Sequence, residues 1–96
     1  MKGKQKRYLR SLAVNIDAIF QIGKGGLNDM LIEQLKDALK ARELIKVKVL
    51  NNCDNTAKEL AEELAAATDS VLVQVIGSNV VLYRHNPEKS QIELPE

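Results

Sequence analysis

The residues of this 96-residue chain best suited to chemistry are the run Gly23-Lys24-Gly25-Gly26. Glycine permits positive φ and lets another backbone come close. Free amides at the start of a following helix favour an anion, and Lys24 adds a positive charge. The run therefore indicates contact with a phosphate group of a nucleotide or nucleic acid. The alternative is a strand-to-helix turn that needs glycine for its geometry alone.

Two nucleotide-binding patterns do not fit this run. The dinucleotide fingerprint G-x-G-x-x-G/A requires a small residue where the chain has Asn28, and Asn51 stands where an acidic residue should follow the next strand. The P-loop pattern G-x-x-x-x-G-K-[ST] is absent. The G-x-x-G clamp of single-stranded nucleic-acid modules is matched by residues 23–26, although four residues alone specify little.

The charges are distributed unevenly along the chain. Residues 1–48 carry 11 basic and 5 acidic side chains, a balance of +6, whereas residues 49–96 carry 3 basic and 8 acidic ones, a balance of −5. The first ten residues contain five basic side chains and no acidic one. This asymmetry predicts an anionic partner for the first half of the chain. The Lys46/Lys48 face of a strand belongs to the same half, and ordinary solvated surface is the competing explanation for it.

Catalysis and metal binding find little support. One histidine and one cysteine cannot build a Cys/His metal cluster. His85 belongs to no local catalytic motif, and Cys53 is best explained as an incidental thiol in a polar loop. The sequence therefore predicts neither an enzyme nor a cofactor. Three scattered aromatic residues also cannot form an extended base-stacking platform, so binding should depend on phosphates and shape.

The sequence also bears on the location of the protein in the cell. No apolar run approaches the roughly 20 residues of a membrane span, and no apolar segment follows the basic start as in a secretory signal. The single cysteine excludes an intramolecular disulfide. These features predict a cytoplasmic protein without a membrane partner.

Hydrophobic periodicity predicts seven elements. Leucines at helical spacing indicate the helices, and alternation or apolar runs indicate the strands. Thr56 and Glu59 stand at capping-box spacing at the start of the third helix, and Gly77-Ser78 suits a two-residue hairpin turn. The elements are a helix over 4–14, a strand over 17–22, a helix over 28–42, a strand over 44–50, a helix from 56, strands over 71–76 and 79–84, and a partly mobile tail over 85–96.

These elements predict a single α+β domain over residues 1–96. The order α-β-α-β-α-β-β gives a right-handed parallel crossover and then an antiparallel hairpin. We therefore expect a two-layer domain in which three helices pack against a mixed four-stranded sheet.

Taken together, KQKRYLRSLA, QIGKGGL, ARELIKVKVL, VQVIG and VVLYR resemble the CRM-domain family (chloroplast RNA splicing and ribosome maturation). The resemblance is closest to its single-domain bacterial YhbY/YqeI-like members and runs from about Lys4 to Pro95. It implies an RNA-binding protein with a fold like the C-terminal domain of a bacterial translation initiation factor. It also implies association with ribosomal RNA in precursors of the large ribosomal subunit.

The resemblance assigns the proposed RNA contact to two parts of the chain. The family's G-x-x-G loop carries over onto Gly23, Lys24, Gly25 and Gly26, and its basic first helix onto Lys4, Lys6, Arg7 and Arg10. On the basis of the charge pattern, we add Arg42, Lys46 and Lys48 to the predicted RNA-binding residues. An alternative function is a protein-interaction adaptor that docks ribosomal or other assembly proteins through its charged faces. An enzyme acting on a phosphorylated small molecule is the remaining alternative.

Overall fold

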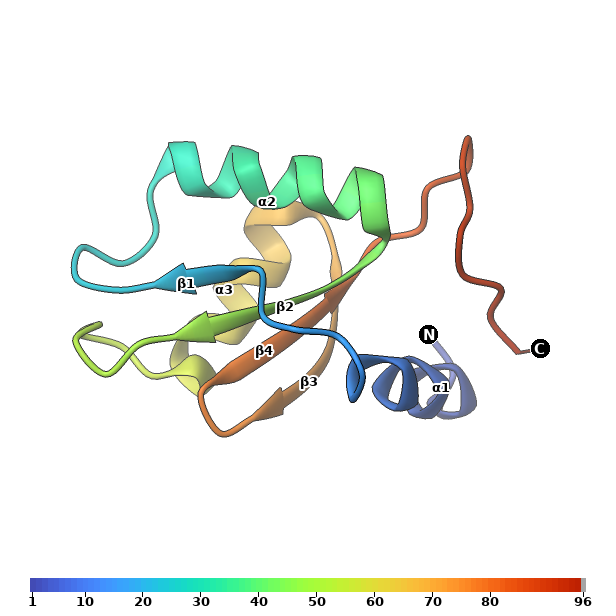
Figure 1. The fold of residues 1–96 in the computed structure, drawn as a ribbon, viewed down its shortest axis with the longest axis horizontal. Coiled ribbons are helices and arrows are strands. Elements are labelled where there is room, and N and C mark those ends of the chain that lie inside the picture. Colours follow the sequence, from blue (N-terminus) through green and yellow to red (C-terminus); the bar gives the residue numbers. More distant parts are fainter. Residues whose placement is uncertain (96) are drawn as a thin grey trace.

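The computed structural model describes residues 1–95 (Figure 1). Its three helices and four strands follow the predicted order, and the predicted α+β class is confirmed. The elements are α1 (Gly3–Ala13), β1 (Phe20–Ile22), α2 (Asp29–Arg42), β2 (Leu44–Val49), α3 (Ala57–Thr68), β3 (Val71–Ile76) and β4 (Asn79–Tyr83).

The sheet has the strand order β1-β2-β4-β3. β1 runs parallel to β2, with Gln21 opposite Lys48. β4 runs antiparallel to both β2 and β3, so the sheet is mixed, as the sequence predicts. β1 is shorter than the predicted strand over 17–22, because residues 14–19 carry the chain from α1 to the edge of the sheet.

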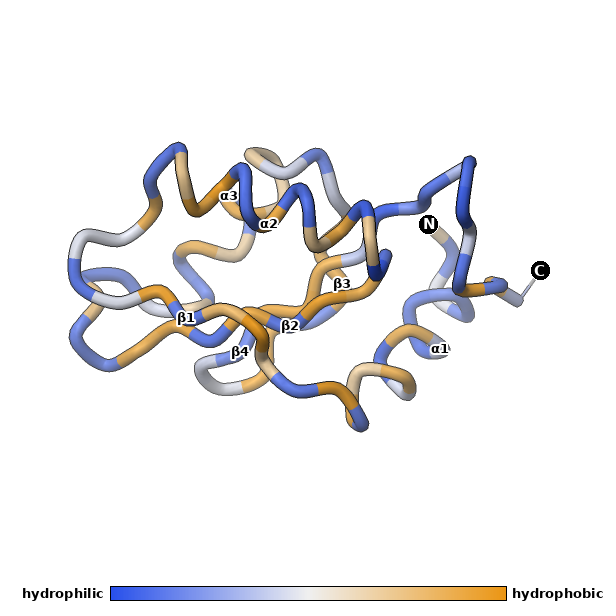
Figure 2. Tube along the Cα trace, turned by 45° about the horizontal axis from the view of Figure 1, so that its top comes forward, coloured by the Kyte–Doolittle hydropathy of each residue, from blue (hydrophilic) through white to orange (hydrophobic). Residues whose placement is uncertain are grey.

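The larger core lies between one face of the sheet and the helices α2 and α3. Ile45, Val47 and Val49 of β2 are each less than 7% exposed and point toward these helices. They meet Leu35 of α2 and Leu64 of α3 in one cluster. Figure 2 shows this pattern as apolar segments that face inward from the helices and the sheet.

The first helix packs on the opposite face of the sheet. Its buried residues Leu9 and Ala13 form a second cluster with Leu44, Val81 and Tyr83. Because side chains alternate along a strand, Leu44 and Ile45 enter different cores. The two-layer prediction is therefore wrong in one respect, since α1 forms a partial third layer that covers only one end of this face.

The predicted capping box begins α3. The Glu59 backbone N–H donates to Thr56 Oγ1 at 3.2 Å, and the Thr56 backbone N–H donates to Glu59 Oε1 at 2.8 Å. The hydrogen bonds from Thr56 lower the pKa of Glu59. Local side-chain chemistry thus places the start of this helix as the spacing predicts.

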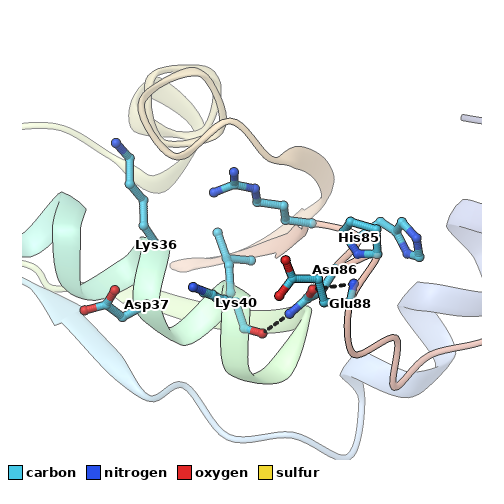
Figure 3. A pocket seen from close by; sticks show the side chains of 9 residues that line it. Lys36, Asp37, Lys40, His85, Asn86 and Glu88 are labelled. Atoms are coloured by element: carbon cyan, nitrogen blue, oxygen red, sulfur yellow. Dashed lines mark hydrogen bonds between the residues drawn. The ribbon is translucent and has the colours of Figure 1, made fainter.

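The tail after β4 returns across α2 and α1. Asn86 Nδ2 donates to the carbonyl oxygen of Lys40 at 2.8 Å (Figure 3), and Gln5 Nε2 donates to that of Pro95 at 3.2 Å. Ile92 and Leu94 pack against the α1 cluster, as their apolar character indicates. The tail predicted over 85–96 is therefore attached to the domain along residues 85–95, and Glu96 lies outside the described residues.

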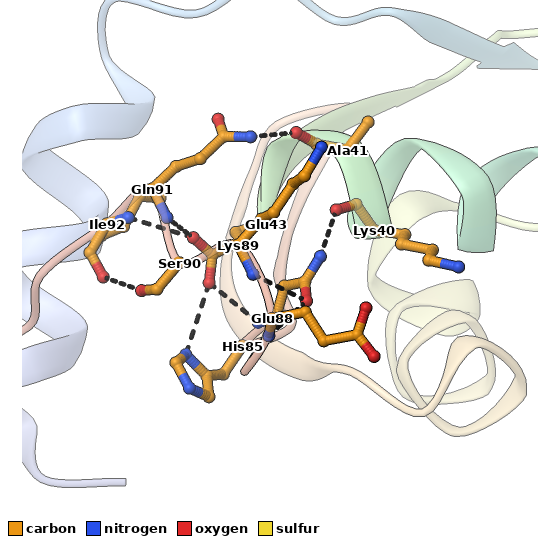
Figure 4. Close-up of polar contacts among 10 residues, drawn as sticks. Lys40, Ala41, Glu43, His85, Glu88, Lys89, Ser90, Gln91 and Ile92 are labelled. Atoms are coloured by element: carbon orange, nitrogen blue, oxygen red, sulfur yellow. Dashed lines mark hydrogen bonds and ion pairs between the residues drawn. The ribbon is translucent and has the colours of Figure 1, made fainter.

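The tail is held mainly by Glu43, the one residue between α2 and β2. Its side chain is completely buried and accepts hydrogen bonds from the backbone N–H groups of Asn86 at 2.9 Å, Ile92 at 3.0 Å and Gln91 (Figure 4). His85 Nδ1 lies 3.4 Å from the same carboxylate. Glu43 also adopts a φ of 64°, a positive value that is strained for a residue other than glycine.

These donors decide the ionisation of Glu43. Burial alone would raise the pKa of its carboxyl group, but the three backbone N–H donors and the charge of His85 outweigh burial and lower that pKa. Burial and then the nearby Glu43 charge raise the pKa of Tyr83. The interior of the domain therefore contains a carboxylate that stays ionised because the tail surrounds it.

No helix in residues 1–95 is both long enough and apolar enough to cross a membrane.

Replacing Glu43 by Gln should lower the free energy of unfolding by about 2–3 kcal/mol at pH 7, because an amide supplies one acceptor oxygen in place of two charged ones. A carboxylate with a lowered native pKa stabilises the fold above its unfolded pKa of about 4.3, and this contribution is lost as the pH falls through the native pKa. The difference between the native protein and E43Q in urea unfolding should therefore narrow below about pH 4.

Glu63→Gln is the matched control, because Glu63 is an exposed carboxylate of α3. It should change the free energy of unfolding by no more than about 0.5 kcal/mol. The contribution of Glu59 is common to all these proteins and cancels in the comparison. A difference between native and E43Q that stays constant from neutral to acid pH would contradict this role of Glu43.

Candidate nucleic-acid interface

The GKGG loop, residues 23–26, connects β1 to α2 at one end of the molecule (left in Figure 1). The Gly26 backbone N–H donates to the Gly23 carbonyl oxygen at 3.1 Å and closes a turn. Gly25 has a φ of 99° and Gly26 a φ of 63°, which side chains disfavour. The two glycines therefore supply the backbone conformation that the turn requires.

Gly23 serves a different purpose. A Cβ atom at this position would lie 3.1 Å from Asn52 Oδ1 and 3.5 Å from Leu50 Cδ1. The absence of a side chain at Gly23 thus allows the loop after β1 to approach the loop after β2. At Gly25 and Gly26 a Cβ atom would meet nothing within 4 Å, so the outer side of the GKGG loop is open to a ligand.

Part of the polar backbone at the start of α2 already has a hydrogen-bond partner within the protein. Asn28 Oδ1 accepts a hydrogen bond from the Leu31 backbone N–H at 2.8 Å, and the Asp29 carboxylate occupies the first turn. An acidic side chain at this end already interacts favourably with the helix dipole. Within residues 1–95, the backbone amides of Lys24 and Gly25 have no protein acceptor. Because the Asp29 carboxylate would repel a second anion at the helix terminus, an anion is better placed at the loop tip than at the terminus that the sequence suggests.

Lys46 and Lys48 lie on the sheet face that carries α1. They alternate with Ile45, Val47 and Val49, which point to the other core. Lys48 is exposed and pairs with Gln21, two residues before the loop, whereas Lys46 is half-buried. Both lysines thus stand on the face between the GKGG loop and α1.

The basic residues of α1 lie farther along the same face. Lys4, Arg7 and Arg10 are exposed and Lys6 is half-buried, while Leu9 is buried beneath them. Figure 1 places α1 at the opposite end of the molecule from the GKGG loop, along a longest dimension of 39 Å. The predicted cations therefore form an extended series, with the β2 lysines between its two ends.

Arg42 lies at the α1 end of this series. It ends α2 and lines a hollow of about 480 Å³ with Leu12, Asp17 and Ile92, among others. Leu12 and Ile92 belong to the α1 cluster or pack against it. Arg42 therefore lies away from the GKGG loop, and it shares this hollow with an acidic residue.

None of the predicted cations forms an ion pair within residues 1–95. The ion pairs there are Lys36–Glu33 at 3.6 Å, Arg84–Asp69 at 3.9 Å and His85–Glu43 at 3.4 Å. The exposed acids Glu62 and Glu63 belong to α3, which packs on the other face of the sheet. The basic series and the acids Glu62 and Glu63 therefore lie on opposite faces of the sheet.

The structure also reveals a second basic hollow that the sequence does not predict (Figure 3). It measures about 290 Å³ and is lined by Lys36 and Lys40 of α2 together with Arg84 and His85 at the end of β4. The i,i+4 spacing of the lysines could have indicated half of it, but Arg84 and His85 approach only through the tertiary fold. Asp37 and Glu88 also line this hollow and offset much of its positive charge.

No group of three or more His, Cys, Asp or Glu side chains in residues 1–95 comes together in a way that could hold a metal ion.

Comparison with known proteins gives a consistent result. The family described as "CRS1 / YhbY (CRM) domain" matches residues 1–84. The Bacillus subtilis protein named "Probable RNA-binding protein YqeI" is 54% identical over 95 residues, which cover 99% of each chain. A Haemophilus influenzae "RNA-binding protein" is 35% identical over 92 residues, covering 96% of this chain and 92% of that protein.

A solved structure agrees with the fold. The solution structure of a hypothetical protein from Staphylococcus aureus superimposes with a TM-score of 0.82. It is 63% identical in sequence and covers 99% of each chain.

Replacing Gly25 by Ala should destabilise the protein by about 1–2 kcal/mol, because only the backbone conformation, and no steric contact, opposes the new methyl group. Gly3→Ala is the control, since Gly3 is helical and a Cβ there also meets nothing within 4 Å. That variant should be neutral or more stable by about 0.5–1 kcal/mol. Urea unfolding checks both values, and equal effects of the two substitutions would contradict this role of Gly25.

Proposed function

Because this chain belongs to the CRS1/YhbY (CRM) domain family, we propose that it is a non-enzymatic RNA-binding protein that acts in assembly of the large ribosomal subunit. The GKGG loop and Lys24 contact phosphate groups at one end of the molecule. Lys48 and Lys46 continue the contact along the sheet face, and Lys4, Lys6, Arg7 and Arg10 extend it to the other end. The RNA partner is ribosomal RNA within precursor particles, and the site of action is the cytoplasm.

The absence of acidic partners around these cations carries this proposal. Cations that formed ion pairs within the protein would have to break them before binding phosphate, whereas those of this series remain available within residues 1–95. Each phosphate neutralised by such a cation releases condensed counterions, which favours binding. The acidic side chains on α3 face away from the series and orient the protein on a polyanion.

The open surface at Gly25 and Gly26 supports a phosphate contact at the loop. A phosphate can approach the unpaired amides of Lys24 and Gly25 without meeting a side chain. The names of the relatives, which refer to RNA binding, agree with this assignment.

The affinity of the native protein for structured ribosomal RNA should fall steeply with salt concentration. Lys24→Ala should weaken binding and reduce the slope of log K against log salt by about 1, because one phosphate contact is lost. Lys58→Ala is the matched control, since Lys58 is exposed on α3, on the opposite face of the sheet. Binding that does not depend on salt, or an equal change in both variants, would contradict the proposed contact.

In cells, the protein should sediment with precursors of the large ribosomal subunit, and Lys24→Glu should release it from them by opposing phosphate at the loop. Sucrose-gradient fractionation followed by immunoblotting measures this distribution. Association that survives nuclease treatment and the Lys24→Glu change would instead support a protein-interaction adaptor that docks ribosomal proteins.

A further inference from the structure

A shallow groove of about 290 Å³ lies beside the GKGG loop, between the edge strand β1 and the first turns of α2. Gln21 and Ile22 line it from β1, and Met30, Leu31 and Gln34 line it from α2. Met30 and Gln34 stand one helical turn apart, so they lie on the same side of α2. The groove shares Gly23, Lys24 and Gly26 with the loop that is proposed to hold phosphate.

The lining of this groove differs from that of the rest of the basic series. Apart from Lys24, it contains only apolar side chains, carboxamides and glycine backbone. Within residues 1–95 the carboxamide of Gln34 makes no hydrogen bond, so both its donor and its acceptor are available. The groove therefore offers little positive charge to neutralise a phosphate. A flat, neutral group with hydrogen-bonding edges is the better match.

Met30 adds an apolar contact at this place. Its side chain is 74% exposed, although it follows directly after the capped start of α2. An exposed methionine alone is ordinary. Here it lines the same groove as Lys24 and Gly26 of the GKGG loop. A polarisable thioether packs well against an aromatic ring.

The size of the groove limits what can enter it. Its volume lies at the low end of the range for ligand pockets, about 300–1,000 Å³. A base within a duplex has its faces stacked and its pairing edge occupied, whereas an unpaired base can be turned out to reach a protein surface. Only a base of the second kind can use both Met30 and the free carboxamide of Gln34.

We propose that this groove is a subsite for an unpaired RNA base, adjacent to the phosphate held by the GKGG loop. This inference rests on the proposed RNA-binding function and specifies it, because it assigns single-stranded or looped-out RNA as the form bound at this end of the molecule. Met30 and Leu31 contact the face of the base, and Gln34 bonds to its edge.

The test compares three RNA probes with equal numbers of phosphates on the strand that is bound: a single-stranded oligomer, the same oligomer without bases, and a blunt duplex. The variant Met30→Ala/Gln34→Ala should bind the single strand about tenfold more weakly than the native protein, because an apolar contact and a hydrogen bond are lost. Its affinity for the oligomer without bases and for the duplex should be unchanged. Fluorescence anisotropy at fixed salt measures all three affinities.

Two further variants separate the possible results. Lys24→Ala should weaken binding to every probe, because it acts on phosphate. Val14→Ala is the matched control, since Val14 is 75% exposed, apolar and distant from the groove; it should bind every probe like the native protein. Thermal unfolding checks that each variant is folded, as expected for substitutions of exposed side chains.

Two results would overturn the subsite while leaving the proposed function intact. These are native affinity of the Met30→Ala/Gln34→Ala variant for all three probes, or an equal loss on the oligomer without bases. Failure of the native protein to bind any of the probes would overturn the proposed function and the subsite together.

Discussion

The buried carboxylate of Glu43 is the interaction on which most of this structure depends. Three backbone amides of the tail converge on it, and its own carbonyl oxygen accepts from the Arg84 backbone N–H at 2.8 Å. Glu43 therefore joins the end of α2, the start of β2, the end of β4 and the tail. The tail in turn brings Ile92 and Leu94 against the α1 cluster. The positive φ of Glu43, which costs on the order of 1–3 kcal/mol, persists because these contacts hold it.

The different side chains on the two faces of the sheet follow from this arrangement. α2 and α3 cover one face completely, so the β2 side chains that point there are apolar. α1 and the tail cover only one end of the other face, so Lys46 and Lys48 reach solvent there. A basic strand face next to a basic helix thus results from partial coverage. The same partial coverage keeps these cations apart from the acids of α3.

The loop between β1 and α2 shows how one short motif combines separate requirements. Gly23 permits close approach to Asn52, whereas Gly25 and Gly26 provide positive φ and open space. Asn28 caps the Leu31 amide, and the negative charge of Asp29 at the start of α2 favours an anion at the loop tip instead. The groove beside the loop exists because β1 is an edge strand and leaves the flank of α2 uncovered.

The sequence by itself determined the elements and their order, because hydrophobic periodicity, the Thr56 capping box and the Gly77-Ser78 turn are local signals. It also indicated the GKGG loop and the basic residues of α1. Only the tertiary structure decided that α1 packs on the second face, that Arg42 lies beside α1 and away from the GKGG loop, and that β1 and α2 line one groove beside that loop. It alone showed that a glutamate at the end of a helix is buried. These features depend on contacts between residues distant in the chain, about which local patterns carry no information.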